Sequence, residues 1–290
     1  MSLKSKKRDL LSIIESEIPN MSKGQKNIAS YILQNYDKAT FMTASSLGKK
    51  VGVSESTVVR FATYLGFDGY PKLQKALQDI VKTKLTTLQR VDMTNELFKD
   101  NDILESVMNL DIAKIRMTLE SINRDDFNKA VNIISNANNI YILGTRSSFA
   151  LSQFMTFYLN YMFKNVRNVN SNSSSGIFDQ IFKISKNDVF IAIGFPRYSM
   201  TTIKAIRFAK DKNATTIAIT DRKDSPLAES ADVTLVARSD MISFIDTLVA
   251  PLSLINSLII SLALKNKDDI PGTFNELENI WKEYEVYQSK

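Results

Sequence analysis

The sequence predicts an all-α helix-turn-helix domain followed by an α/β domain with a five-stranded parallel sheet flanked by helices. Two observations lead to this prediction. Apolar residues before residue 86 recur at helical spacing, whereas from residue 139 short apolar runs alternate with helical stretches, as in βαβ units. A length of 290 residues also suits two domains better than one.

The change of pattern sets the expected domain limits. We expect the helix-turn-helix domain at residues 1–85, a helical connector at 86–124 and the α/β domain at 125–290. The connector is assigned as helical because apolar residues such as Ile103 and Val107 recur at helical spacing among charged residues.

Five short apolar runs of the α/β domain are predicted strands. They cover residues 140–143, 166–169, 189–193, 216–220 and 233–236. Helices are expected near residues 149–164, 177–184, 203–212, 227–230 and 244–264. The last stretch is almost free of charge, but it contains Pro251 and several polar residues, which favours a buried helix over a membrane span.

The residue inventory excludes several classes of site. The chain has no Cys and no His, which removes disulfides, thiolate nucleophiles, Ser-His-Asp triads and His-bearing zinc sites. Residues 1–15 lack the apolar run and small-residue cleavage site of a signal peptide. We therefore expect a cytoplasmic protein with no cofactor, no metal site and no membrane partner.

Basic charge is concentrated in the first third of the chain. Residues 1–90 contain 15 Lys and Arg against 7 Asp and Glu, a net charge of +8, while the whole chain carries +6. The remaining 200 residues are therefore slightly acidic. This asymmetry favours a polyanion as the partner of the first domain. A basic surface that is merely solvated is the alternative.

Residues 43–66 read TASSLGKKVGVSESTVVRFATYLG, the order of a helix-turn-helix. Thr43 or Ser45 is expected to cap a short helix, Gly52 to form the turn and Ser54 to cap the second helix. In this motif the second helix enters the major groove with its amino-terminal residues facing the bases. A helical hairpin that binds protein is the alternative.

The second helix of this motif is amphipathic. Its predicted inward face consists of Val58, Phe61, Ala62 and Leu65. The residues expected to contact double-stranded DNA are on its outward face or are flanking lysines suited to phosphates: Ser54, Glu55, Ser56, Thr57, Arg60, Lys49, Lys50, Lys72 and Lys75. Arg60 is the candidate for a forked contact with guanine.

Two glycines directly follow predicted strands, and each begins a loop that carries one arginine and several hydroxyls. Ligands of open α/β sheets bind at the carboxyl ends of strands, and these side chains suit phosphate or carboxylate. The expected ligand-binding residues are Gly144, Arg146, Ser147, Ser148, Arg197, Tyr198, Ser199, Thr201 and Thr202. Ordinary strand-to-helix turns would use Gly and Ser as well, but they need no arginine.

Residues 21–81 resemble the helix-turn-helix domain of the RpiR family of bacterial regulators. The resemblance is clearest in VGVSESTVVRFATYLGFDGYPKLQKAL at residues 51–77, which has a GVS turn, a TVxRF recognition helix, an LGFxGY stretch and a following Lys-containing helix. It implies that this domain reads an operator.

Residues 125–265 are similar to a sugar isomerase (SIS) domain, the usual carboxy-terminal partner in the RpiR family. A further matching stretch is DRKDSPLAESADVTLVA at residues 221–237. The resemblance implies dimerisation through this domain and a phosphosugar held by two loops, commonly Gly-x-Gly-x-Ser and Ser-x-Ser-Gly-x-Thr.

This chain departs from both loop patterns. Ser148 keeps the serine of the first loop and Ser199 stands in place of the threonine of the second, but Arg146 and Arg197 each replace a glycine. Glycine and proline stand where the second loop has its two serines. We therefore expect the site to bind its anion with the help of arginine, the ligand being a phosphosugar or a related sugar acid.

The expected function is a transcription regulator of sugar or sugar-acid metabolism that acts as a homodimer or larger oligomer on a palindromic operator. The apolar helices at 149–163 and 244–264 are the candidate dimer surfaces. The alternative is a sugar-phosphate isomerase with an appended helical domain, which would need a base such as Glu229. No glutamate lies in the two loops, so we expect no catalytic residues.

Overall fold

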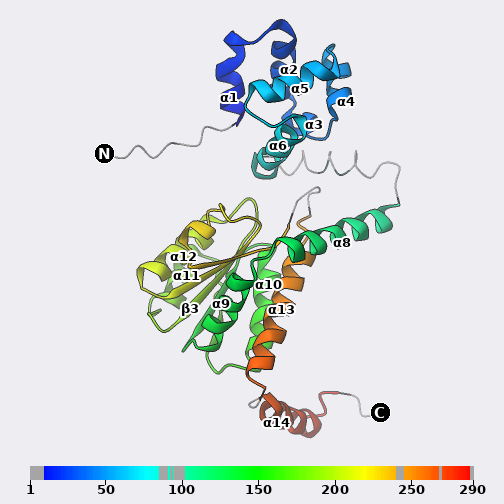
Figure 1. Ribbon diagram of the computed structural model, residues 1–290. Coiled ribbons are helices and arrows are strands. Elements are labelled where there is room, and N and C mark those ends of the chain that lie inside the picture. The colour runs from blue at the N-terminus through cyan, green and yellow to red at the C-terminus, as the bar shows by residue number, and fades with distance from the viewer. Residues whose placement is uncertain are drawn as a thin grey trace. The chain divides into compact units, whose positions relative to one another are not determined.

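The computed structural model describes residues 10–84, 91, 94, 102–239, 245–267 and 270–287 (Figure 1). The chain divides into two compact units, Met1–Glu96 and Leu97–Lys290. Much of the predicted connector at 86–124 lies outside the described residues, and most of its described part forms helix α8 (Ile103–Ser121). The domain limits at residues 85 and 124 therefore stay a prediction.

The described part of the first unit is helical. Its helices are α1 (Leu10–Glu17), α2 (Lys23–Gln34), α3 (Tyr36–Ala39), α4 (Ala44–Val51), α5 (Glu55–Tyr64) and α6 (Tyr70–Lys84), with a 3₁₀ turn η1 (Ile18–Asn20) after α1. They share one apolar core. Val58, Phe61 and Ala62 of α5 are buried in it as predicted, whereas Leu65 is partly buried.

The second unit contains the predicted five-stranded parallel sheet. Its strands are β1 (Ile140–Gly144), β2 (Val166–Asn168), β3 (Val189–Ile193), β4 (Thr215–Thr220) and β5 (Val233–Val236). Their order in the sheet is β2-β1-β3-β4-β5, and every pair is parallel. Every residue of β1 and β3 is buried, which explains their unbroken apolar runs.

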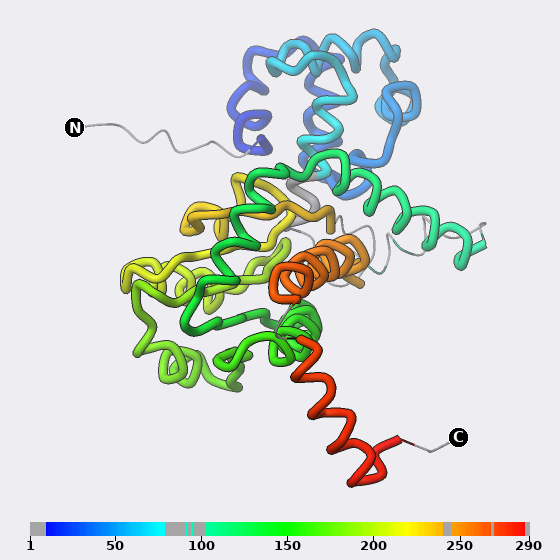
Figure 2. Tube along the Cα trace, turned by 60° about the horizontal axis from the view of Figure 1, so that its bottom comes forward, coloured from blue at the N-terminus to red at the C-terminus, as the bar shows by residue number. Residues whose placement is uncertain are grey.

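Helices cover both faces of the sheet (Figures 1 and 2). One face packs against α9 (Arg124–Ser135), α10 (Ser148–Leu159) and α13 (Val249–Lys265). The other face packs against α11 (Ser174–Ile181) and α12 (Met200–Asp211). The helix predicted at 244–264 begins only at Val249, and the one predicted at 227–230 is a single 3₁₀ turn, η2 (Ala228–Ser230).

Helix α13 contains the apolar stretch that raised the question of a membrane span. It buries seven of its residues, from Ala250 to Leu262, within the second unit. In the described part of the chain, no helix is by itself long and apolar enough to cross a membrane. Among the described helices, α13 and α14 (Ile270–Glu283) meet that test when taken together, by length and composition, and the two are bent by 104°.

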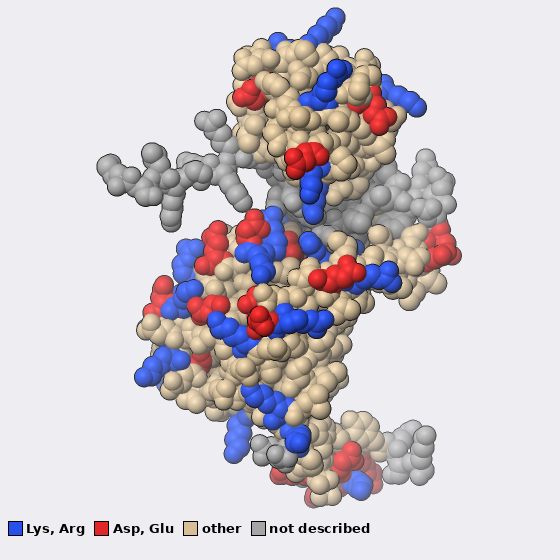
Figure 3. All heavy atoms as spheres, viewed as in Figure 1, with Lys and Arg blue, Asp and Glu red and all other residues tan. Residues whose placement is uncertain are grey.

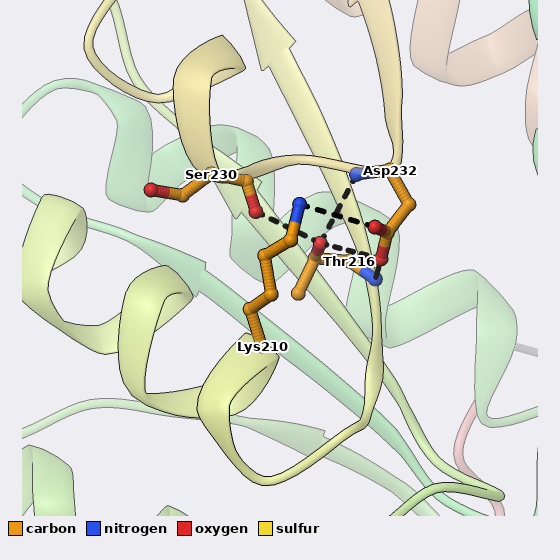
Figure 4. A network of polar contacts seen from close by, with 4 residues as sticks. All are labelled: Lys210, Thr216, Ser230 and Asp232. Atoms are coloured by element: carbon orange, nitrogen blue, oxygen red, sulfur yellow. Dashed lines mark hydrogen bonds and ion pairs between the residues drawn. The ribbon is translucent and has the colours of Figure 1, made fainter. Parts of the chain in front are cut away.

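A polar network ties the start of β4 to the start of β5 (Figure 4). Thr216 Oγ1 lies 2.8 Å from Asp232 Oδ2 and 3.0 Å from the carbonyl oxygen of Ser230. Asp232 also accepts a hydrogen bond from the Thr216 N–H at 2.9 Å and pairs with Lys210 Nζ at 3.2 Å. Burial opposes ionisation of Asp232, but the Thr216 donors and the Lys210 ammonium outweigh it and lower the pKa of this carboxyl.

We expect Asp232→Asn to lower the free energy of unfolding by about 1 kcal/mol or less at pH 7, because the carboxylate is partly exposed and its ion pair is screened. A carboxyl with a lowered pKa stabilises the fold above its unfolded pKa of about 3.9 and loses this effect as pH falls through the folded value. Urea unfolding at pH 7 and pH 3 measures both effects. Asp211→Asn, at an exposed position of α12, is the control. An equal loss at both pH values would contradict the role of the charge.

Candidate DNA interface and anion site

Helices α4 and α5 are joined by the tight turn that the sequence predicts. Thr43 caps α4 by accepting a hydrogen bond from the Ser46 N–H at 3.1 Å, so it fills the role for which Ser45 was the alternative. Gly52 ends α4 with a φ of +72°, a conformation that glycine adopts without strain. Ser54 caps α5 by accepting from the Thr57 N–H at 3.3 Å. The motif thus has the local geometry of a helix-turn-helix.

A second glycine of α4 allows this turn to close. A Cβ atom at Gly48 would lie 2.8 Å from the carbonyl oxygen of Val53, so a side chain there would collide with the backbone of the turn. No role was predicted for Gly48. Its only signal is a glycine inside a predicted helix, where glycine is costly and often marks close packing.

The outward face of α5 gathers the predicted base-reading side chains. Glu55, Ser56 and Arg60 are exposed, and Thr57 is partly buried. Arg60 Nη2 donates to Thr57 Oγ1 at 3.4 Å, so the guanidinium lies over the first turn of the helix. The Ser54 hydroxyl is used by the helix cap, and its first role is therefore structural.

The predicted phosphate-binding lysines are exposed. Lys49 and Lys50 lie in the last turn of α4, and Lys72 and Lys75 lie near the start of α6. Residues 10–84 hold ten Lys and Arg against six Asp and Glu. On the face of the second unit visible in Figure 3, by contrast, basic and acidic side chains are interspersed.

The loops after β1 and β3 line one cleft, because these two strands are neighbours in the sheet. Strand β2 lies on one side of β1, whereas β3, β4 and β5 follow on the other side. Ligands of such folds bind at this switch in strand order, between β1 and β3. The cleft encloses about 430 Å³ of empty space, part of which is open to solvent. Its lining residues are Thr145, Arg146, Ser147, Ser148, Gly194, Phe195, Pro196, Arg197, Ser199, Thr202 and Asp246.

Two helices begin at this cleft, α10 after the first loop and α12 after the second. Their N-cap residues are Ser147 and Ser199, and neither caps its helix through its side chain. The first N–H groups of a helix lack partners within the helix and carry partial positive charge. The cleft therefore combines two helix amino termini with serine hydroxyls that do not cap them, an arrangement that suits an oxyanion.

Both arginines of the cleft have backbone conformations that favour glycine. The φ angle is +57° at Arg146 and +60° at Arg197. An L-residue in this region costs about 1 kcal/mol or more, and such strain collects at functional sites. These are the two positions at which the SIS loop patterns have glycine. Arginine occupies both positions despite this cost, which supports a role for both guanidinium groups.

Two residues predicted for the ligand site, Tyr198 and Thr201, do not line the cleft. The Tyr198 hydroxyl donates to Asp221 Oδ1 at 2.5 Å. Burial, together with the negative charge of Asp221, raises the pKa of Tyr198, so this phenol stays protonated. Thr201 Oγ1 lies 3.2 Å from Ser174 Oγ. Both side chains therefore join parts of the fold beside the cleft.

Gly144, a third predicted ligand residue, shapes the loop and does not line the cleft. A Cβ atom at Gly144 would lie 2.2 Å from the carbonyl oxygen of Ser148, so only glycine lets α10 start this close to β1. Gly194 lies in the cleft, where a Cβ atom would approach Leu227 Cδ2 to 3.0 Å.

Asp246 lines the cleft although it was not among the predicted ligand-binding residues. Its carboxylate accepts a hydrogen bond from the hydroxyl of Ser147, which is 99 positions away in the sequence. No motif surrounds Asp246, so only the folded chain reveals its position. Within the described residues, no group of three or more acidic side chains is placed to hold a metal ion.

Two family models match this chain. The model of the helix-turn-helix domain of the rpiR family matches residues 8–84, and the SIS domain model matches residues 133–261. An uncharacterized HTH-type transcriptional regulator of Caldanaerobacter subterraneus subsp. tengcongensis is 25% identical, over 90% of this chain and 93% of its own. Another from Haemophilus influenzae is 27% identical, over 92% and 93%.

Two solved structures share the fold. The Vibrio vulnificus NanR protein complexed with ManNAc-6P is 21% identical with a TM-score of 0.57, over 93% of this chain and 98% of that one. The sugar isomerase domain of an RpiR transcription factor from Sphaerobacter thermophilus is 22% identical with a TM-score of 0.57, over 61% and 98%. Since both domain models match in the same order as the two units, the chain belongs to the RpiR family of helix-turn-helix transcriptional regulators with a SIS domain.

Proposed function

We propose that this protein regulates the transcription of genes for sugar or sugar-acid metabolism, and that a phosphosugar or related anion in the cleft after β1 and β3 sets its affinity for operator DNA. The observation on which this proposal depends is the pairing of Arg146 and Arg197 at the start of two helices in one cleft. Arginine side chains bind phosphate and carboxylate through paired hydrogen bonds, and helix amino termini bind the same groups through backbone N–H donors.

The charges of the cleft favour a doubly charged ligand. Two guanidinium groups and two helix amino termini of about +0.5 each outweigh the single carboxylate of Asp246, which leaves about +2. A phosphate monoester carries about −1.5 to −2 at pH 7. The structural neighbour from Vibrio vulnificus was solved with ManNAc-6P, a phosphosugar, which supports the same ligand class here.

We infer that the protein acts in the cytoplasm as a homodimer or larger oligomer on a palindromic operator. Support comes from apolar side chains exposed on the two helices that the sequence marked as dimer surfaces. Phe157 of α10 and Ile260 and Leu264 of α13 are exposed, although both helices also pack on the sheet. Two-fold symmetry would place two α5 helices on half-sites roughly one helical turn, or a multiple of it, apart.

The alternative function, a sugar-phosphate isomerase, needs a base beside the substrate. Glu229 lies in η2 and is not among the residues that line the cleft. The described lining contains one carboxylate, Asp246, and it is bonded to Ser147. We therefore propose that the protein is not an enzyme. Turnover of any compound in a panel of phosphosugars would refute this.

Two measurements on the purified full chain test the proposed function. Binding to the DNA upstream of its own operon should weaken steeply between 50 and 200 mM salt, because lysine contacts with phosphates release counterions. A thermal-shift screen of hexose 6-phosphates, ManNAc-6P and sugar acids should find a stabilising ligand, which at 100 times its Kd adds about 2.7 kcal/mol. Absence of salt-sensitive DNA binding would overturn the regulator, and absence of any stabilising anion would overturn the sensor.

Arg60→Ala should weaken operator binding by about 1–3 kcal/mol and relax the preference at one base pair, if Arg60 forks onto a guanine. A gel-shift series with single base-pair changes in the operator measures both effects. Thr63→Ala is the matched control, because the Thr63 hydroxyl donates at 3.3 Å to the Val59 carbonyl of its own helix. Unchanged affinity in Arg60→Ala would remove this residue from the interface.

A further inference from the structure

The segment before α13 contacts the anion cleft through one residue and helix α8 through the next. Asp246 accepts the hydrogen bond from the Ser147 hydroxyl inside the cleft. Thr247 Oγ1 donates to Asp111 Oδ1 of α8 at 2.6 Å. The side chains of Asp246, Thr247 and Asp111 are all partly buried. The cleft and α8 are thus joined through two consecutive residues.

Polar contacts join α8 to the segment after β5, and that segment to Thr247. Thr118 Oγ1 accepts from the Arg238 N–H at 2.9 Å, and the Ser239 hydroxyl donates to the Thr247 carbonyl at 3.0 Å. The buried residues of α8 are Lys114 and Thr118.

The apolar side chains of α8 contribute little to this attachment. Leu104, Met108 and Ile112 are each more than half exposed. Because these side chains bury little apolar surface, displacing this part of α8 has a low free-energy cost. Among the described elements of the second unit, α8 comes first in the chain.

Asp246 is the one negatively charged residue in the described lining of a cleft built for anions. In the free protein its carboxylate offsets part of the positive charge of Arg146 and Arg197, and it accepts the hydrogen bond that the Ser147 hydroxyl donates. A bound anion would repel this carboxylate and compete for the same hydroxyl. The cleft therefore has two states with different affinity for an anion, which is what a ligand needs to shift an equilibrium.

We propose that Asp246 is the switch of the ligand site: the bound anion displaces it from Ser147, and Thr247 carries the movement to Asp111 and so to α8. The proposal rests on the proposed function, because it assigns the regulation of the same cleft. By linkage, any interaction that holds α8 in place weakens anion binding. The bound anion weakens the attachment of α8 by the same free energy.

Hydrogen exchange on the full chain tests the switch, with inorganic phosphate and ManNAc-6P as probes. In the wild type, we expect slower exchange in the loops 144–148 and 194–202 and at least threefold faster exchange in α8. In Thr247→Val, the loops should still be protected, while α8 should exchange at a rate that the probes no longer change. Asp111→Ala should behave in the same way, because it removes the other partner of that hydrogen bond.

Asp246→Asn separates charge from hydrogen bonding, because asparagine still accepts from Ser147. It should bind phosphate at least threefold more tightly and lose the response of α8. Ser257→Ala is the control, since the Ser257 hydroxyl donates at 2.9 Å to the Ser253 carbonyl within α13. It should respond like the wild type.

Three outcomes would overturn the proposal. Loop protection without faster exchange in α8 of the wild type removes the switch and leaves the anion site standing. A probe-dependent α8 response that persists in both Thr247→Val and Asp111→Ala assigns the coupling to other contacts. Failure of both probes to protect either loop overturns the anion site, and the switch with it.

Discussion

Replacing Arg146 and Arg197 together with alanine should abolish the ligand response while sparing operator binding. A hydrogen bond to a charged group contributes about 1.5–3 kcal/mol, so loss of two such partners should cost about 3–6 kcal/mol, or roughly 10²- to 10⁴-fold in affinity. The change lies in the second unit, whereas the DNA-reading helix lies in the first. Calorimetry with the ligand found in the thermal-shift screen and gel shifts with operator DNA measure the two activities separately.

Replacing Arg146 and Arg197 with glycine separates the effect of losing the guanidinium groups from the effect of the backbone strain. Alanine keeps a side chain in the left-handed region, whereas glycine relieves the strain at both positions but adds backbone entropy to the unfolded chain. We expect both pairs of substitutions to lose the ligand, with little change in stability for the glycine pair. Arg207→Ala, at an exposed position of α12, is the control. A ligand response retained in either double variant would remove the proposed anion site.

Phe61→Ala should unfold the helix-turn-helix unit and so abolish DNA binding. Phe61 is fully buried in the core shared by the helices of the first unit. Truncation of a buried Phe costs about 3–5 kcal/mol, a large part of the 5–15 kcal/mol by which a domain is typically stable. Because the second unit has cores of its own, ligand binding should survive.

Calorimetry and gel shifts check this outcome, with Phe41→Ala as the control, at an exposed Phe of the same unit. The Phe61 variant should show an early melting transition assigned to the first unit, while the transition that the ligand stabilises stays in place. Simultaneous loss of DNA and ligand binding would contradict the independence of the two cores.

The sequence predicts the helix-turn-helix well, because its determinants lie within a few residues of one another. A helix is capped by a hydroxyl that lies three residues before the N–H it bonds, as at Thr43 and Ser54. A glycine at the end of a helix adopts a positive φ, as at Gly52. The strands are equally recognisable, because a strand buried on both faces must be apolar throughout. In each case the pattern reflects local backbone geometry and burial.

The residues of the anion cleft were only partly predictable. The two loops were selected because each follows an apolar strand and carries an arginine, but nothing local places Tyr198 and Thr201 outside the cleft. Their orientation depends on partners more than twenty positions away, such as Asp221 for Tyr198. Nor does residue type reveal that both arginines adopt positive φ angles.

Amino-acid order alone therefore specified the two domains, the recognition helix and the two arginine-bearing loops, since periodicity, capping and turn chemistry act over short distances along the chain. The pairing of β1 with β3 was settled only by folding, and this pairing brings the two loops into one cleft. The same is true of Asp246, which reaches Ser147 across 99 positions. Contacts between distant segments arise from packing the whole sheet and its helices, and no local pattern encodes them.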